Sequence, residues 1–271
     1  MLGKLCKQEF KAANHYFAPL YLTMLVLAVA LSFVLTIVYL WKNEVFSNIT
    51  LPFVIAIFVI SLIAISLGTF LICIFRFEQT MVGNEGYLTH TLPVTIDELF
   101  FSRLIVAFTY HVISFLITLL FLAGAVLFIL LFVGGFQEID TTQIMIAWNG
   151  FKKEMGLSLI SGILIAVLGI ISVIVDLISG LLVCYLAIAL AQCMKAHRIL
   201  WTAVFYICIN IGCQFLSNLL VGAGSLLSLF MDSAAGTMIS TLGVTSLIGI
   251  VVSIAAYFMT RYLFTRHLNL E

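Results

Sequence analysis

LPFVIAIFVISLIAISLGTFLICIF, residues 51–75, contains no charged side chain, and Arg76 follows it directly. A helix needs about 20 apolar residues to cross the hydrocarbon core of a bilayer, and this stretch is long enough to do so. Its apolar residues are continuous and do not alternate with polar ones, which predicts a membrane-spanning helix instead of a β-barrel strand. The stretch therefore indicates a helical membrane protein.

The composition of the whole chain agrees with this interpretation. Of its 271 residues, 63% are hydrophobic and 9% are charged, whereas a soluble domain is about half apolar and about a quarter charged. A soluble fold of this size could not bury so much apolar surface, and in lipid only helices and closed barrels satisfy the backbone. The formal net charge is zero, so we expect no nucleic-acid partner.

Apolar runs separated by polar segments predict an all-α polytopic protein with six transmembrane helices in a single domain, residues 1–271. The runs lie at about 18–41, 51–75, 104–133, 157–193 and 201–262, and the last of them accommodates two spans. The fourth run is longer than one span needs, so its first residues are expected to protrude from the outer surface or to lie along it. Polar loops are expected at 42–50 and, on the outer side, at 135–156.

The basic residues predict the orientation, because cytoplasmic loops carry an excess of Lys and Arg. With six spans and both termini inside, nine basic side chains face the inner side and three face the outer side. The inner set is Lys4, Lys7, Lys11, Arg76, Arg103, Lys195, Arg198, Arg261 and Arg266, and the outer set is Lys42, Lys152 and Lys153. Dividing the fourth run into two spans would leave five inside and seven outside, so six spans with cytoplasmic termini is the better interpretation.

Two segments depart from simple spans. Residues 1–17 place apolar side chains at helical spacing and three lysines on another face, which predicts an interfacial amphipathic helix with its apolar side in lipid. A frayed terminal segment is the alternative. In residues 222–237, glycines and serines interrupt surplus apolar sequence. This pattern predicts a re-entrant or interfacial hairpin on the outer side, between the last two spans.

Residues 77–103 form the polar segment between the second and third spans. Asn84 is expected to cap a short helix with Glu85 in its first turn. Pro93 ends that helix, because the residue before a proline avoids the α region. TIDE (95–98) is a capping box that starts a new helix continuing into the third span. The segment therefore predicts a short, rigid helix at the cytoplasmic membrane face, with an ordinary loop as the alternative.

This layout resembles the permease subunit of ABC-2-type (type V) ABC exporters. FRFEQTMVGNEGYLTHTLPVTIDELFFSRLIVA (75–107) is similar to a loop of small bacterial permeases in which an EGYL-x-x-TLP string recurs, and YLAIALAQCMKAHRIL (185–200) resembles the inner end of their fourth span. These permeases have six helices, cytoplasmic termini, an N-terminal interfacial helix, a coupling helix after the second span and an outer re-entrant hairpin. The likeness in layout covers nearly the whole chain and implies a place in the bacterial cytoplasmic membrane.

The resemblance implies a transport subunit that is not itself an enzyme. Such permeases pair with a second permease, of the same or a homologous chain, and bind two copies of an ABC ATPase subunit. This chain has no GxxxxGK[ST] loop, so ATP and Mg are expected on the ATPase and no cofactor on this chain. The contact with the ATPase is expected at Glu85, Tyr87, Leu88, Thr89, His90 and Leu92.

Polar residues within the spans suggest a translocation path. Asp176 lies in the fourth apolar run, where a carboxylate is costly. It either faces water near the outer interface or takes part in helix packing, or it contacts cargo or a cation. Asn210, Gln214 and Asn218 are four residues apart and share one helical face, so they either line a cavity or form hydrogen bonds between helices. Four glycines in the spans are expected to be sites of close helix packing: Gly162, Gly169, Gly243 and Gly249.

Two other classes of function stay open, a stand-alone channel or membrane sensor and a polytopic membrane enzyme. His90 and His111 are the residues that an enzyme would use, but no ligand or catalytic partner falls at a suitable spacing around either of them. The six cysteines form no CxxC pair, so we expect inert thiols and no bound metal. Peptides, lipids, drugs and polysaccharides all stay open as cargo.

Overall fold

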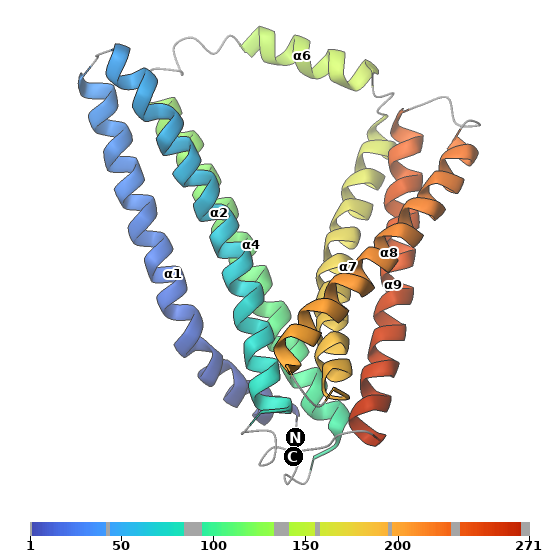
Figure 1. Cartoon of the computed structure of the whole chain (residues 1–271). Coiled ribbons are helices and arrows are strands. Elements are labelled where there is room, and N and C mark those ends of the chain that lie inside the picture. Colours follow the sequence, from blue (N-terminus) through green and yellow to red (C-terminus); the bar gives the residue numbers. More distant parts are fainter. Residues whose placement is uncertain are drawn as a thin grey trace. The chain divides into compact units, whose positions relative to one another are not determined.

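The computed structural model describes residues 2–41, 44–83, 94–132, 141–154, 158–194, 197–228 and 234–266. In this part of the chain every regular element is an α-helix (Figure 1). The helices are α1 (Leu2–Trp41), α2 (Glu44–Met81), α4 (Ile96–Phe132), α6 (Thr141–Glu154), α7 (Leu159–Ala191), α8 (Arg198–Ser228) and α9 (Ala234–Arg266). Within the described residues, six helices are long and apolar enough to cross a membrane, as the sequence predicts for a polytopic membrane protein.

The chain divides into two compact units. The first consists of residues 1–77 and 98–140 and contains α1 with most of α2 and α4. The second consists of residues 78–97 and 141–271 and contains α6 to α9 together with the segment that joins α2 to α4. Both α2 and α4 therefore begin or end in one unit and continue into the other.

The first unit is a three-helix group in which α1 packs on both α2 and α4. The ring of Phe17 stacks on that of Tyr110 in α4, with centroids 3.9 Å apart. On the α2 side, a Cβ added at Gly68 would lie 3.1 Å from Leu20 Cδ1, so the missing side chain lets α1 approach closely. Aromatic stacking and a small residue at the contact are both typical of helix packing in membranes.

A chain of hydroxyl groups joins these three helices in their interior. Ser114 Oγ of α4 lies 2.8 Å from Tyr21 Oη of α1 and 2.7 Å from Thr69 Oγ1 of α2. Thr69 is fully buried and also donates to the carbonyl oxygen of Ile65. Because lipid offers polar groups no partner, such hydroxyls are satisfied within the protein.

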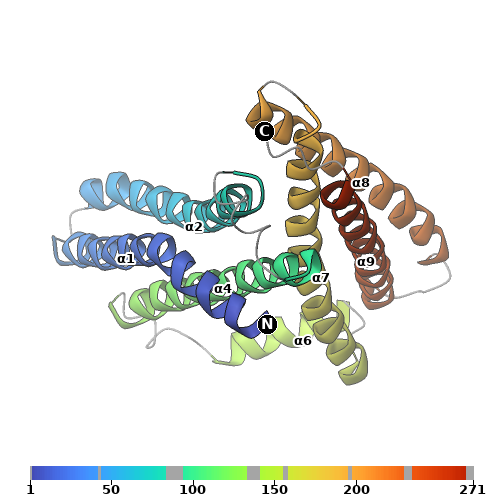
Figure 2. The same ribbon diagram turned by 90° about the horizontal axis from the view of Figure 1, so that it is seen from below.

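The N-terminal segment differs from the prediction in two ways. It is continuous with the first span, since α1 passes through Pro19 without a break. The later part of its apolar stripe packs on protein, not in lipid as expected, because Ala13 and Phe17 are only 3% and 1% exposed. Figure 2 shows the first turns of α1 crossing α4, which offers the ring of Tyr110 as a packing surface. The three lysines of this segment are exposed, as the amphipathic pattern predicts.

In the second unit, α9 packs along α7, and α8 crosses both obliquely (Figure 1). A Cβ at Gly249 of α9 would lie 2.6 Å from Cγ1 of Val175 in α7, so this glycine is required by the close approach of the two helices. The prediction of a packing site is confirmed for Gly249. At Gly162, Gly169 and Gly243 an added Cβ would meet nothing within 4 Å among the described residues, so the described part of the chain shows no close packing at these three positions.

The fourth apolar run is one helix, which supports six spans over seven. At 33 residues, α7 is about 50 Å long and exceeds the roughly 30 Å hydrocarbon core, so it must protrude or tilt. Its start is capped by Ser158, whose hydroxyl accepts a hydrogen bond from the Ser161 amide at 3.1 Å. The cap explains why the helix begins at this point instead of earlier in the polar segment.

Helix replaces three of the expected irregular segments. Residues 44–50 belong to α2, and residues 141–154 of the expected outer loop form α6. The expected hairpin at 222–237 is partly helical, because α8 continues to Ser228 and α9 begins at Ala234. The central residues 229–233 of the expected hairpin lie outside the described residues, so the hairpin stays a prediction. Glycine and polar residues disfavour a helix only weakly, so these segments remain compatible with one.

Candidate functional site

The segment predicted to bind a partner is described at both of its ends. After Met81, α2 closes with the amides of Val82 and Gly83 donating to the carbonyl oxygen of Glu78 at 3.0 and 2.8 Å. A Cβ at Gly83 would lie 2.9 Å from the oxygen of Gln79, so only glycine fits this helix end. The following helix starts at Ile96, as the capping box predicts. Between these ends, residues 84–93 lie outside the described residues, and with them Glu85, Tyr87, Leu88, Thr89, His90 and Leu92.

On the α2 side, an ionic cluster joins three helices of the first unit. The carboxylate of Glu9 in α1 lies 2.9 Å from the guanidinium of Arg76 in α2 and 3.6 Å from Arg103 Nε in α4. The ring of Tyr16 faces the same Arg76, whose Cζ lies 5.6 Å from the ring centroid. The three charged side chains of the cluster are 5–20% exposed. Glu9 therefore ties the last turns of α2 and the first turns of α4 to α1.

Burial makes this cluster important for stability. A buried guanidinium without a counter-charge is unfavourable, and removing one partner of a buried ion pair typically costs about 3–5 kcal/mol. Glu9 supplies a carboxylate to two such groups, while the face of Tyr16 offers a cation–π contact to one of them. Thus the chain on both sides of the polar segment is fixed to α1 by one acidic residue.

On the α4 side, a second cluster lies within the other unit. Asp97, in the first turn of α4, accepts a hydrogen bond from the Tyr257 hydroxyl on Oδ1 at 2.9 Å. Its other oxygen, Oδ2, lies 3.0 Å from the guanidinium of Arg261. Tyr257 and Arg261 are four residues apart on α9 and so share one face of that helix. Each carboxylate oxygen has its own partner, which holds Asp97 in one orientation.

The sequence did not predict either cluster. In the sequence, three of the four charged partners serve only to predict the orientation of the chain in the membrane: Arg76, Arg103 and Arg261. Asp97 is interpreted only as part of a capping box. One signal was available: Glu9 is an isolated acidic residue among three lysines on the first helix. An acidic residue at the end of a span is expected to pair with a basic residue, because a lone carboxylate is unfavourable there. A single sequence does not indicate which basic residue is the partner.

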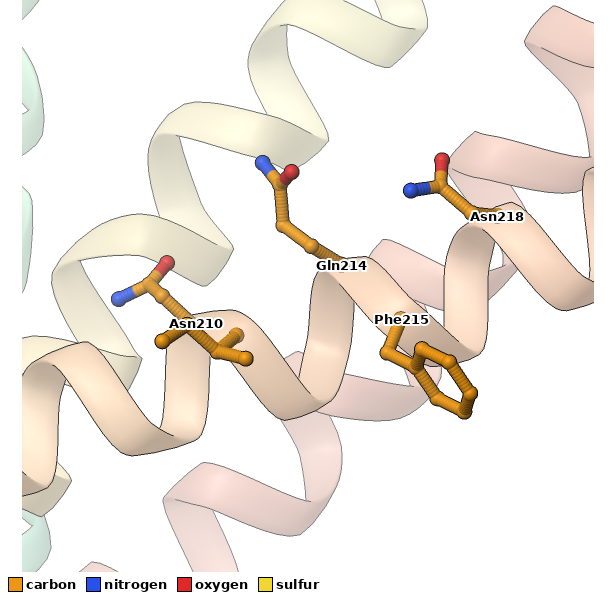
Figure 3. A pocket seen from close by; sticks show the side chains of 5 residues that line it. Asn210, Gln214, Phe215 and Asn218 are labelled. Carbon is orange, nitrogen blue, oxygen red and sulfur yellow. The ribbon is translucent and has the colours of Figure 1, made fainter.

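The three amides of α8 share one face, as predicted. Figure 3 shows Asn210, Gln214 and Asn218 projecting to one side of the helix and Phe215 to another. With Ile211, these residues line an open groove of about 370 Å³. The amide nitrogen of Asn210 donates to the Tyr206 carbonyl of its own helix at 2.9 Å. Among the described residues, the side chains of Gln214 and Asn218 make no hydrogen bond and are exposed.

Asp176 is also exposed, near the middle of α7. Asp176 lies about 23 Å along the helix axis from Ala191, the last residue of α7. A hydrocarbon core of roughly 30 Å that began at Ala191 would therefore include Asp176. Within the described part of the chain, its carboxylate forms no ion pair or hydrogen bond, including with Asn210, Gln214 or Asn218. The structure therefore places the three amides on one face of α8. It shows no hydrogen bond between Asp176 and any of them in the described residues.

His111, one of the two histidines considered for catalysis, lies beside a cysteine. Cys73 Sγ is 3.8 Å from His111 Nδ1, and the same nitrogen is 2.9 Å from the carbonyl oxygen of Ala107. A carbonyl only accepts, so Nδ1 carries the hydrogen and cannot remove a proton from the thiol. The pair therefore lacks the arrangement of a Cys–His catalytic dyad. No group of three or more metal-ligating side chains occurs in the described ranges, and His90 lies outside them.

Comparison of the chain with known protein families, with curated proteins and with solved structures finds no match.

Proposed function

We propose that this chain is the permease subunit of an ATP-driven exporter of the ABC-2 type, in the bacterial cytoplasmic membrane with both termini inside. The observation that carries the proposal is the polar segment between α2 and α4, fixed on each side by an ion-paired cluster. Glu9 joins Arg76 and Arg103 in one unit, and Asp97 joins Arg261 in the other. Anchors at both ends hold the segment in a fixed place on the two units, as a coupling element requires.

In this proposal the segment is a coupling helix that binds a separate ATPase subunit. The contact residues are Glu85, Tyr87, Leu88, Thr89, His90 and Leu92, and two ATPase copies serve a pair of permeases. Closure of the ATPases around ATP and Mg moves the two coupling helices and opens the space between the permeases to the outside. This is a two-state element whose equilibrium a nucleotide shifts.

The amide face of α8 is the proposed wall of the translocation path. Carboxamides are unfavourable in hydrocarbon unless a partner or water satisfies them. Gln214 and Asn218 are exposed and make no hydrogen bond within the described chain, so a wet path between two permeases would satisfy them. Asp176, exposed on α7, is a second candidate for contact with water or cargo.

Co-purification tests the proposal. The tagged chain is isolated in mild detergent from its native host, and the proteins that accompany it are identified by mass spectrometry. The same procedure is applied to Leu88→Asp and Tyr87→Ala, with Leu120→Asn as a matched control on an exposed apolar residue of α4. A Walker-type ATPase that accompanies the parent and the control but not the two loop variants supports the proposal.

A consistent lack of an ATPase would contradict the proposal and favour a stand-alone channel or sensor. Such a protein would function in liposomes without nucleotide and would tolerate Leu88→Asp. A membrane enzyme is the remaining alternative, and His90→Ala with His111→Ala tests it. Loss of turnover in either variant, with ATPase binding intact, would favour catalysis.

A further inference from the structure

The contacts of Asp97 join the polar segment to the last helix of the chain. Asp97 follows the segment 84–93 after three residues and lies in the first turn of α4. Its carboxylate receives the Tyr257 hydroxyl at 2.9 Å and the Arg261 guanidinium at 3.0 Å, one on each oxygen. A carboxylate in the first turn of a helix is also favoured by the helix dipole. These three residues are called the Asp97 clasp below.

The receiving side of the clasp is a well-packed part of α9. Ala256, Thr260 and Phe264 are 2%, 0% and 4% exposed, and they recur every four residues along one face. Tyr257 and Arg261 each follow directly after a member of this buried row. Tyr257 and Arg261 therefore lie next to the face of α9 that packs on the rest of the protein. A movement of Asp97 would act on α9 beside this packed face.

The clasp contributes little to the stability of the fold. The side chains of Asp97 and Arg261 are 33% and 49% exposed, and ion pairs so open to solvent contribute little to stability. Their geometry is nevertheless specific, because the hydrogen bond from Tyr257 to Oδ1 and the ion pair of Arg261 with Oδ2 fix the direction of the carboxylate as well as its position. Such a contact is suited to transmitting movement.

We infer that Asp97 is a positioning residue that couples movement of the segment 84–93 to α9 through Tyr257 and Arg261. The inference rests on the proposed function, since it requires an ATPase to move the segment. In the complex, the clasp makes α9 follow the coupling helix. Without it, the ATPase still binds at residues 85–92, but α9 no longer responds to nucleotide.

Hydrogen–deuterium exchange of the purified permease–ATPase complex tests the inference. Exchange is compared with and without ATP, Mg²⁺ and vanadate, in peptides covering residues 78–97 and 257–266. The variants are Asp97→Asn, Arg261→Gln and the exchange of charges Asp97→Arg with Arg261→Asp. Lys153→Gln, which removes an exposed cation from α6, is the control.

In the parent and the control, trapping the nucleotide is expected to change exchange in both peptides. In Asp97→Asn and Arg261→Gln, the change in 78–97 persists, whereas the change in 257–266 becomes at least several-fold smaller. The charge exchange restores part of it, which a general loss of folding would not do.

An unaltered response of 257–266 in Asp97→Asn, with the ATPase still bound, would overturn this inference and leave the proposed function intact. Absence of the ATPase from the parent complex would overturn both.

Discussion

Glu9 and Arg76 are 67 residues apart in the chain, and their side chains meet at 2.9 Å. The contact joins the first turns of α1 to the last turns of α2, immediately before the polar segment. Because Arg103 of α4 also approaches Glu9, at 3.6 Å, one carboxylate connects three helices. The N-terminal segment is thus a part of the packed first unit.

Glu9→Gln should destabilise the protein by about 3–5 kcal/mol, because two largely buried guanidinium groups lose their counter-charge. The free energy of unfolding is measured by titration with SDS from mild detergent. Lys11→Gln is the control, since Lys11 is exposed on the same helix and its loss should change stability by less than about 0.5 kcal/mol. Equal effects of the two substitutions would mean that the cluster around Glu9 contributes no stability.

Gly249→Ala should weaken the packing of α9 on α7. The new Cβ would lie 2.6 Å from Val175 Cγ1, and a valine in a helix has one strongly preferred rotamer. Overpacking of this kind costs about 1–3 kcal/mol. Val175→Ala in the same chain should recover part of the loss.

Gly243→Ala is the matched control on the same helix, because an added Cβ there meets nothing within 4 Å. It should be neutral or stabilising by up to about 1 kcal/mol, as expected from helix propensity. The close approach of α7 and α9 would be disproved by a Gly249→Ala protein as stable as the Gly243→Ala protein.

The hydroxyl chain of the first unit predicts energetic coupling between Tyr21 and Ser114. Tyr21→Phe and Ser114→Ala each remove a partner of the 2.8 Å hydrogen bond. A double-mutant cycle on unfolding free energies should give a coupling of about 0.6 kcal/mol, typical of hydrogen bonds between helices in membranes. Additive effects of the two substitutions would show that the hydrogen bond makes no net contribution.

The proposed path on α8 predicts a difference between two faces of that helix. In a variant without native cysteines, Gln214→Cys and Asn218→Cys should react several-fold faster with a membrane-impermeant methanethiosulfonate than Leu216→Cys and Leu219→Cys, which lie outside the lining of the groove. The reagent attacks a thiolate, which forms in water and not in hydrocarbon. All four native side chains are exposed, so exposure alone predicts no difference. Similar rates at the four positions would argue against a wet amide face.

Much of the fold follows from local sequence. The spans are predictable because uninterrupted apolar sequence of sufficient length has few alternatives to a helix in lipid. The start of α4 at Ile96 is likewise predictable, because a capping box acts within one turn. The shared face of Asn210, Gln214 and Asn218 follows from their spacing alone.

What the sequence missed depends on contacts between distant residues or on polar helices. Polar composition suggested a loop at residues 141–154, but that segment forms α6, since polar residues are compatible with a helix. The partner of Glu9 and the partner of Asp97 are set by tertiary packing, which one sequence does not contain. The same holds for glycines, because Gly249 and Gly243 look alike in sequence and differ only in what lies beside them.

The central claim is that the segment between α2 and α4 binds an ATPase. Photo-crosslinking from this segment in living cells tests it most directly, with a photoreactive amino acid placed at Leu88 and, as control, at the exposed Ile146 of α6. We predict a crosslinked product at Leu88 whose partner carries a GxxxxGK[ST] sequence, and no such product at Ile146. Crosslinking at Leu88 only to lipid or to proteins without that sequence would contradict the proposed function.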